Sequence, residues 1–164
     1  MSLNHLAIYL NDHLAGATAA VELLGHLEQK TNAIGPFAAR LRQDIVADRD
    51  ELAALMRSVK IPVSTTRKAG GWLSEKLAEL KVHFDDPSDG SLRLLEMLEA
   101  IAVGIEGKRA LWTALTVAAE TAPELLSLNY ARLLGRVDEQ RMQVEAQRLI
   151  AARAALGTIE HAPR

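Results

Sequence analysis

Four polar residues occupy positions where a helical core should be apolar, and their chemistry needs an explanation. They comprise a histidine, an acid, a base and an amide, spread widely along the chain: His13, Asp48, Arg109 and Gln140. Each falls near the midpoint of a long helical pattern, on or beside its apolar stripe. A charge buried in a core is costly unless it is paired or bound to a metal. The sequence therefore predicts a central polar layer that either neutralises itself or binds something.

Asp48 falls near the centre of one apolar stripe, and three interpretations of it are open: a solvent-reaching rim position, a buried and paired carboxylate, or a metal ligand. The polar positions expected opposite it in a later segment are Lys108 and Arg109. We expect Arg109 to hold the Asp48 carboxylate, because a guanidinium can bind a carboxylate through two hydrogen bonds. We expect Lys108 to lay its methylenes along the core and extend its ammonium into water.

His13 and Gln140 complete the predicted layer. His13 lies on the edge of its stripe, where it is either a boundary histidine bonded to a neighbouring helix or a ligand and proton acceptor. It is the member of the layer that we expect to titrate near neutral pH. Gln140 lies in the apolar seam of the last segment, where a polar residue more often sets helix register than binds a ligand.

The elements that must position this layer follow from the spacing of apolar residues. Spacings of three and four predict long helices at about 3–29, 36–60, 91–120 and 123–156. The segment at about 61–90 is rich in turn residues and contains one short predicted helix at about 71–82. This segment is far longer than an ordinary helix–helix connection, so we expect a crossover that runs the length of the bundle. The predicted chain is all-α, with a single domain over residues 1–164.

Two helices, a long crossover and two more helices resemble the ferritin-like superfamily of four-helix bundles. The resemblance implies four antiparallel helices and, in the metal-binding members, two Glu-x-x-His pairs. Here the residues that stand three places before the histidines are all non-acidic: Ser2, Leu10, Leu23, Leu80 and Thr158. The standard dimetal motif is therefore absent, and we expect no cofactor. An alternative is an atypical iron or manganese site built from four oxygen and nitrogen ligands: His13, Asp48, Glu51 and Glu106.

Composition narrows the classes of function. The chain has 164 residues and a formal net charge of −2, with acids and bases interleaved, so it carries no basic footprint for nucleic acid. It has no cysteine, which excludes disulfides and thiolate chemistry and fits a reducing compartment, so we expect a cytoplasmic protein. Neither a signal peptide nor an apolar run long enough for a membrane span is evident.

These observations favour a non-catalytic helical bundle, an interaction or stress-associated protein that self-associates as a homodimer through alanine-rich faces. We do not expect an enzyme. The alternative is a ferritin-like oxidoreductase that binds iron or manganese through non-standard ligands. A further hypothesis is a binder of a small apolar ligand between the helices, with the crossover helix around Trp72 as a lid.

Overall fold

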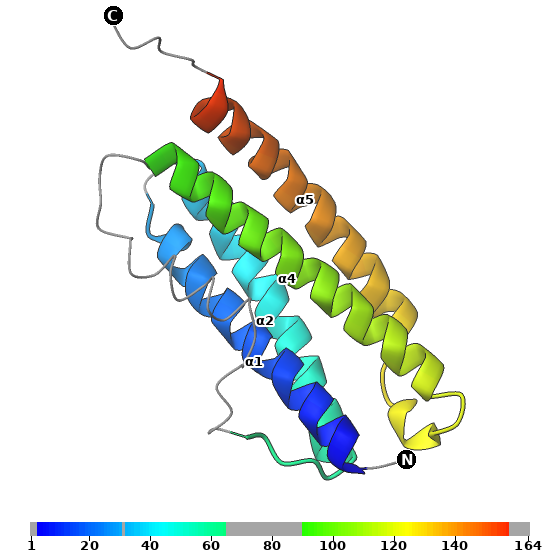
Figure 1. Cartoon of the computed structure of the whole chain (residues 1–164). Coiled ribbons are helices and arrows are strands. Elements are labelled where there is room, and N and C mark those ends of the chain that lie inside the picture. Colours follow the sequence, from blue (N-terminus) through cyan, green and yellow to red (C-terminus); the bar gives the residue numbers. More distant parts are fainter. Residues whose placement is uncertain (1–2, 31, 65–89, 158–164) are drawn as a thin grey trace, which may run out of the picture.

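Four long α-helices form the protein (Figure 1), as seen in a computed structural model that describes residues 3–30, 32–64 and 90–157. The helices are α1 (Leu3–Glu28), α2 (Ile34–Ser58), α4 (Gly90–Ala118) and α5 (Tyr130–Leu156), with a short 3₁₀ turn, η2 (Pro123–Leu125). No strand occurs in the described ranges. The predicted all-α helical bundle is confirmed. The short helix expected at about 71–82 lies outside the described residues.

The helices form two antiparallel hairpins, α1 with α2 and α4 with α5 (Figure 1). Helices α2 and α4 run in the same direction, because α4 starts at the end of the bundle opposite to that where α2 finishes. Helix α1 also packs on α4, and α2 packs on α5. These four packed pairs are thus antiparallel, an arrangement compatible with a ferritin-like bundle.

The last helix starts later than the sequence predicts. Pro123 begins the 3₁₀ turn η2, and α5 starts only at Tyr130, where the Asn129 side chain accepts a hydrogen bond of 3.0 Å from the Arg132 amide. The Tyr130 hydroxyl donates to the Leu125 carbonyl at 2.5 Å and holds the turn against the helix. Proline suits the first turn of either kind of helix, and the expected start at about residue 123 was seven residues too early.

A single buried amide fastens the chain that leaves α2 onto α1. The Asn11 side chain is 6% exposed and donates to the carbonyls of Ala7, at 2.8 Å, and Pro62, at 3.2 Å. Its carbonyl oxygen accepts a hydrogen bond of 2.7 Å from the Ser64 amide. The buried polar groups of Asn11 are therefore satisfied, and the start of the segment after α2 has a defined place beside α1.

The core is aliphatic, with Trp112 of α4 fully buried at 6.4 Å from the ring of Tyr130. Most close approaches between helices lie within the two hairpins, and fewer join one hairpin to the other. Small residues stand between the hairpins on both sides, including Gly16 and Ala17 of α1 and Gly107 of α4. None of the described helices combines the length and apolarity that crossing a membrane requires.

Candidate functional site

Asp48 of α2 is the centre of a buried ion-pair cluster. Its side chain is 2% exposed, and both carboxylate oxygens accept hydrogen bonds. Oδ1 accepts from Arg136 Nη1 at 2.9 Å, whereas Oδ2 accepts from Lys108 Nζ at 2.5 Å and from Gln140 Nε2 at 3.0 Å. We call Asp48, Lys108, Arg136 and Gln140 the Asp48 cluster. It joins α2, α4 and α5 at one level of the bundle.

Gln140 closes the network because its amide both donates and accepts. Its nitrogen donates to Asp48, and its oxygen accepts a second hydrogen bond from the Lys108 ammonium. Gln140 is 1% exposed, so an unmet amide group there would be costly. Several hydrogen bonds to the same carboxylate offset the large cost of taking the charges out of water. The buried salt bridge predicted at Asp48 is confirmed.

Burial controls the titration of Lys108. Desolvation lowers the pKa of its ammonium, and the Asp48 carboxylate opposes that shift by attraction and hydrogen bonding. The positive charge of Arg136 lowers the pKa further, while Asp44 raises it slightly. Desolvation is the larger effect, so the pKa of Lys108 lies below its ordinary value.

The expected pairing of Asp48 with Arg109 is wrong, as is the expectation that Lys108 reaches water. Lys108 is 13% exposed and binds Asp48, whereas Arg109 points to the surface of α4 and pairs with Asp138 of α5. Consecutive helical residues differ by about 100° in direction, and the apolar spacing does not fix which of two neighbouring bases faces Asp48. Arg136, which was not among the predicted members of the layer, stands one turn before Gln140 on the same face of α5, and this spacing is the signal for it.

His13 of α1 lies near the Asp48 cluster but in the wall of a cavity. Its ring stacks edge-on against Tyr9, with centroids 4.6 Å apart and planes at 72°. Burial lowers the pKa of the His13 imidazole, and the nearby Asp12 carboxylate partly opposes the shift. The structure therefore places His13 and Lys108 around one cavity, while Arg109 lies outside it.

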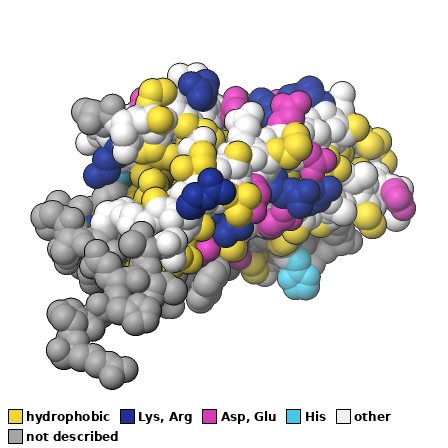
Figure 2. Space-filling view, turned by 90° about the horizontal axis from the view of Figure 1, so that it is seen from above, with side chains coloured by type: hydrophobic (Ala, Val, Ile, Leu, Met, Phe, Trp, Pro, Cys, Tyr) yellow, Lys and Arg dark blue, Asp and Glu magenta, His cyan; other side chains and the backbone are white. Residues whose placement is uncertain are grey.

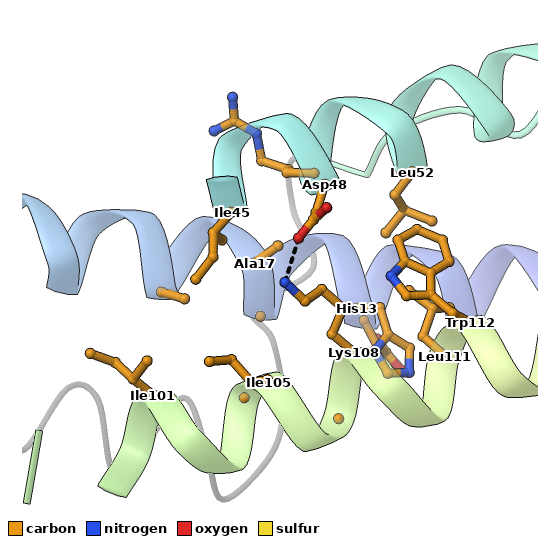
Figure 3. Close-up of a pocket in the computed structure, with 16 residues that line it drawn as sticks. His13, Ala17, Ile45, Asp48, Leu52, Ile101, Ile105, Lys108, Leu111 and Trp112 are labelled. Atoms are coloured by element: carbon orange, nitrogen blue, oxygen red, sulfur yellow. Dashed lines mark hydrogen bonds and ion pairs between the residues drawn. The ribbon is translucent and has the colours of Figure 1, made fainter. Parts of the chain in front are cut away.

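The cavity has a volume of about 240 Å³ and lies among α1, α2 and α4 (Figure 3). Aliphatic and aromatic side chains make up most of its wall: Ile45, Leu52, Ile101, Ile105, Leu111 and Trp112. Lys108 reaches from α4 across to Asp48 on α2, with the His13 ring close to the base of the lysine side chain in this view (Figure 3). Its polar lining consists of Asp12, His13, Asp48, Arg49 and Lys108, so the site is a mainly apolar pocket with acids and bases in its wall.

The residues present do not fit a dimetal centre. Asp48 is held by two cationic side chains, which would repel a metal ion at the same oxygens. Glu51 pairs with Arg132 at 2.5 Å, and Glu106 pairs with Arg141 at 3.5 Å. The four ligands of the alternative metal site, His13, Asp48, Glu51 and Glu106, are therefore not gathered, and no group of three or more His, Asp or Glu residues suited to a metal ion occurs in the described part of the chain.

The outer face of α5 carries exposed apolar side chains. Met142, Leu149 and Leu156 are 64%, 55% and 63% exposed and follow one another at heptad spacing, so they form one stripe along the helix. Glu145 lies in this stretch and accepts two hydrogen bonds from Arg148, at 2.7 and 2.8 Å. We call Met142, Leu149 and Leu156 the α5 stripe.

The charged side chains of the surface are mixed in sign. Seen from above, Lys and Arg groups lie beside Asp and Glu groups, with apolar side chains between them (Figure 2). Ion pairs between exposed or partly exposed side chains also occur, such as Arg109–Asp138 and Arg132–Glu51. The face in view therefore has no broad patch of one sign.

No protein-family model matches this chain, and no match is found among curated proteins or among solved structures. Its likeness to ferritin-like bundles consequently rests on the order, direction and packing of the helices.

Proposed function

We propose that this protein is a non-catalytic, ferritin-like helical bundle that acts by binding other molecules and self-associates through the α5 stripe. The observation that carries the proposal is the row of exposed apolar residues at heptad spacing on α5. Such a face leaves apolar area in water on the free chain, and a second helix would cover it. A second copy of the chain is the partner that the stripe fits best, as its sequence is self-complementary.

The self-complementarity follows from a two-fold axis at Leu149. Two antiparallel copies of α5 that cross there bring Leu149 against the partner's Leu149 and Met142 against the partner's Leu156. The same axis sets Glu145 opposite the partner's Arg153 on both sides of the contact. An apolar centre flanked by two opposite-charge pairs is the ordinary pattern of an antiparallel helix pair.

The condition of the polar layer supports a role without catalysis. Both oxygens of the Asp48 carboxylate are occupied by hydrogen bonds from Lys108, Arg136 and Gln140. Three hydrogen bonds from neighbouring side chains tie this carboxylate to α4 and α5, which favours a structural role over catalysis. We therefore assign the Asp48 cluster to the registration of α2, α4 and α5. The cytoplasm is the proposed location, on the ground of the cysteine-free composition.

The oligomeric state tests the proposal. Size-exclusion chromatography with light scattering should give a dimer mass for the wild type and a monomer mass for Leu149→Glu, because the axis would bring two carboxylates together. The matched control is Val117→Glu, which adds the same charge to an exposed valine of α4 and should leave the dimer intact. A wild type that stays monomeric at high concentration, or equal dissociation of both variants, would sink the proposal.

A charge exchange tests the orientation of the two copies. Glu145→Arg should weaken the dimer, because it faces the partner's Arg153, and the double variant Glu145→Arg with Arg153→Glu should restore it. A double variant whose dimer is as weak as that of the single variant would contradict the antiparallel arrangement.

A further inference from the structure

The cavity between the hairpins exists because glycines stand where larger residues would fit. A Cβ atom added at Gly16 of α1 or Gly107 of α4 would meet no atom within 4 Å. Both glycines line the cavity, and glycine inside a helix costs roughly 0.5–1 kcal/mol relative to alanine. A close approach of another backbone is the usual reason for such a glycine, and it does not apply here. The two glycines therefore keep open a space that the helices alone would be more stable without.

The size and lining of this space fit a small organic molecule. A volume of about 240 Å³ corresponds to roughly eight water-sized groups. The wall is aliphatic on α2 and α4, where Ile45, Ile101 and Ile105 face the space. An occupant must accordingly be mainly apolar, with a chain or ring of modest length.

The polar wall holds two acids, Asp12 and Asp48, and two bases, Arg49 and Lys108, so its hydrogen-bond donors decide which head group fits. Lys108 and Arg136 both bind the Asp48 carboxylate, and Asp44 adds a second negative charge near Lys108. The Lys108 ammonium has three N–H donors, and two of them go to Asp48 and Gln140. Within the described residues no acceptor is assigned to the third donor. A carboxylate head group in the cavity would supply that acceptor.

Trp112 adds a second donor in the cavity wall. Its side chain is 1% exposed, and its indole Nε1 makes no hydrogen bond to any described residue. A buried donor without an acceptor is uncommon and costs free energy. In Figure 3 the nitrogen edge of the indole faces the side on which Lys108 lies. Both underused donors therefore belong to the same cavity.

We propose that the cavity binds a small monocarboxylate with an apolar tail of about eight carbons, with its head group at Lys108 and its tail against Ile101 and Ile105. The carboxylate accepts the third ammonium hydrogen, and the tail fills the space beside Gly16 and Gly107. This site is separate from the α5 stripe, so binding does not depend on self-association.

Fluorescence titration with three probes of equal chain length tests the head-group chemistry. Trp72→Phe leaves Trp112 as the sole indole, and its emission reports binding of octanoate, 1-octanol or octylammonium to the full chain. We expect one octanoate per chain, bound at least about tenfold more tightly than octanol, and no saturable binding of octylammonium. Calorimetry on the unaltered chain gives the same ranking without the reporter substitution. Absence of octanoate binding, or equal affinity for octanol, would overturn the proposal.

Variants of α4 locate the site. Lys108→Met should abolish the preference for octanoate over octanol, whereas the neighbouring Arg109→Met should retain it, because Arg109 lies outside the cavity.

Gly107→Leu and, independently, Gly16→Leu should remove binding of both probes by filling the space. Circular dichroism checks that each variant is folded. If one glycine variant does not fold, the other is sufficient for the test. Unchanged binding in a folded glycine variant would place the ligand elsewhere and refute this site. The Leu149→Glu variant should bind octanoate like the wild type, which separates this proposal from that of self-association.

Discussion

Lys108 and Arg109 are adjacent in sequence, yet they belong to two ion-pair settings of very different character. Lys108 and its partner Asp48 are 13% and 2% exposed, whereas Arg109 and its partner Asp138 are 40% and 46% exposed. The inner pair is part of a network over α2, α4 and α5, while the outer pair joins only α4 and α5. An ion pair between a basic side chain and an aspartate is thus part of the buried structure in Lys108–Asp48 and a minor surface contact in Arg109–Asp138.

The difference follows from solvent. Water already stabilises each charge of the exposed pair, so bringing the two together adds about 0–1 kcal/mol. Burial removes that stabilisation, so each charge of the inner cluster depends on its neighbours. Loss of one member then leaves the others desolvated and uncompensated. The comparison therefore predicts that the same type of substitution lowers the free energy of unfolding strongly in the inner cluster and weakly in the outer pair.

Asp48→Ala should have the largest effect, because it leaves the partly buried Lys108 and Arg136 without their shared carboxylate. We expect a loss of about 3–5 kcal/mol in the free energy of unfolding, measured by urea denaturation. The matched Asp138→Ala should lose about 1 kcal/mol or less. Similar losses in the two variants would abolish the distinction between inner and outer pairs.

Lys108→Met should have a smaller effect, because Arg136 and Gln140 still bind Asp48 in its absence. A loss of about 1–3 kcal/mol is expected, against less than about 0.5 kcal/mol for Arg109→Met. Double-mutant cycles measure the coupling directly, Asp48 with Lys108 in one cycle and Asp138 with Arg109 in the other. A larger coupling energy for Asp138 with Arg109 than for Asp48 with Lys108 would contradict the comparison.

The pH dependence of stability should carry the mark of Lys108. Its pKa is lowered in the folded state from the ordinary 10.5, so between these two pKa values the unfolded chain binds more protons. The contribution of Lys108 to stability should therefore rise with pH over that window and level off above 10.5. The raised pKa values of Tyr9 and Tyr130 contribute an opposite slope in every variant, so urea titrations should show the rise as a difference between the wild type or Arg109→Met and Lys108→Met. A wild type that instead loses stability relative to Lys108→Met would reverse the sign and exclude desolvation as the cause.

His13 should give the smallest effect. Burial lowers its pKa from 6.5, so the unfolded chain takes up the proton first as the pH falls. Stability should decline from pH 6.5 down to the folded pKa and then level off, because below both pKa values the folded and unfolded chains carry the same proton. His13→Phe should lack this part of the acid dependence, and replacement of the exposed His26 by Gln should keep it. An identical acid profile for His13→Phe and the wild type would contradict the assignment.

The positions of the helices and of Asp48 and Gln140 could be predicted because helical periodicity places them directly. Periodicity does not give side-chain direction to within one residue, so it does not distinguish Lys108 from Arg109 as the partner of Asp48. Arg136 flanks the seam of α5, where arginine is also common on the surface, so only the contact with Asp48 identifies it. The predicted start of α5 was wrong for a similar reason, because Pro123 fits the first turn of an α-helix and of a 3₁₀-helix equally well.

Features that depend on distant chain segments were harder to predict. Asn11 does not stand out in the sequence, because its partners Pro62 and Ser64 are 51 and 53 residues away. A cavity is likewise a property of several helices together, and no single stripe reveals it. Gly16 and Gly107 were the available signal, but in sequence a helical glycine that permits close packing looks the same as one that leaves space.

The Asn11 amide has a consequence for the order in which the chain assembles. The bonds from Asn11 to residues 62 and 64 close a loop that includes nearly the whole α1–α2 hairpin. Loop closure is entropically cheaper once the hairpin has brought these ends together, so this joint forms late in folding. It can also open alone, since two hydrogen bonds break without separating any pair of helices. Hydrogen exchange at the Ser64 amide should therefore report a local opening that is faster than global unfolding.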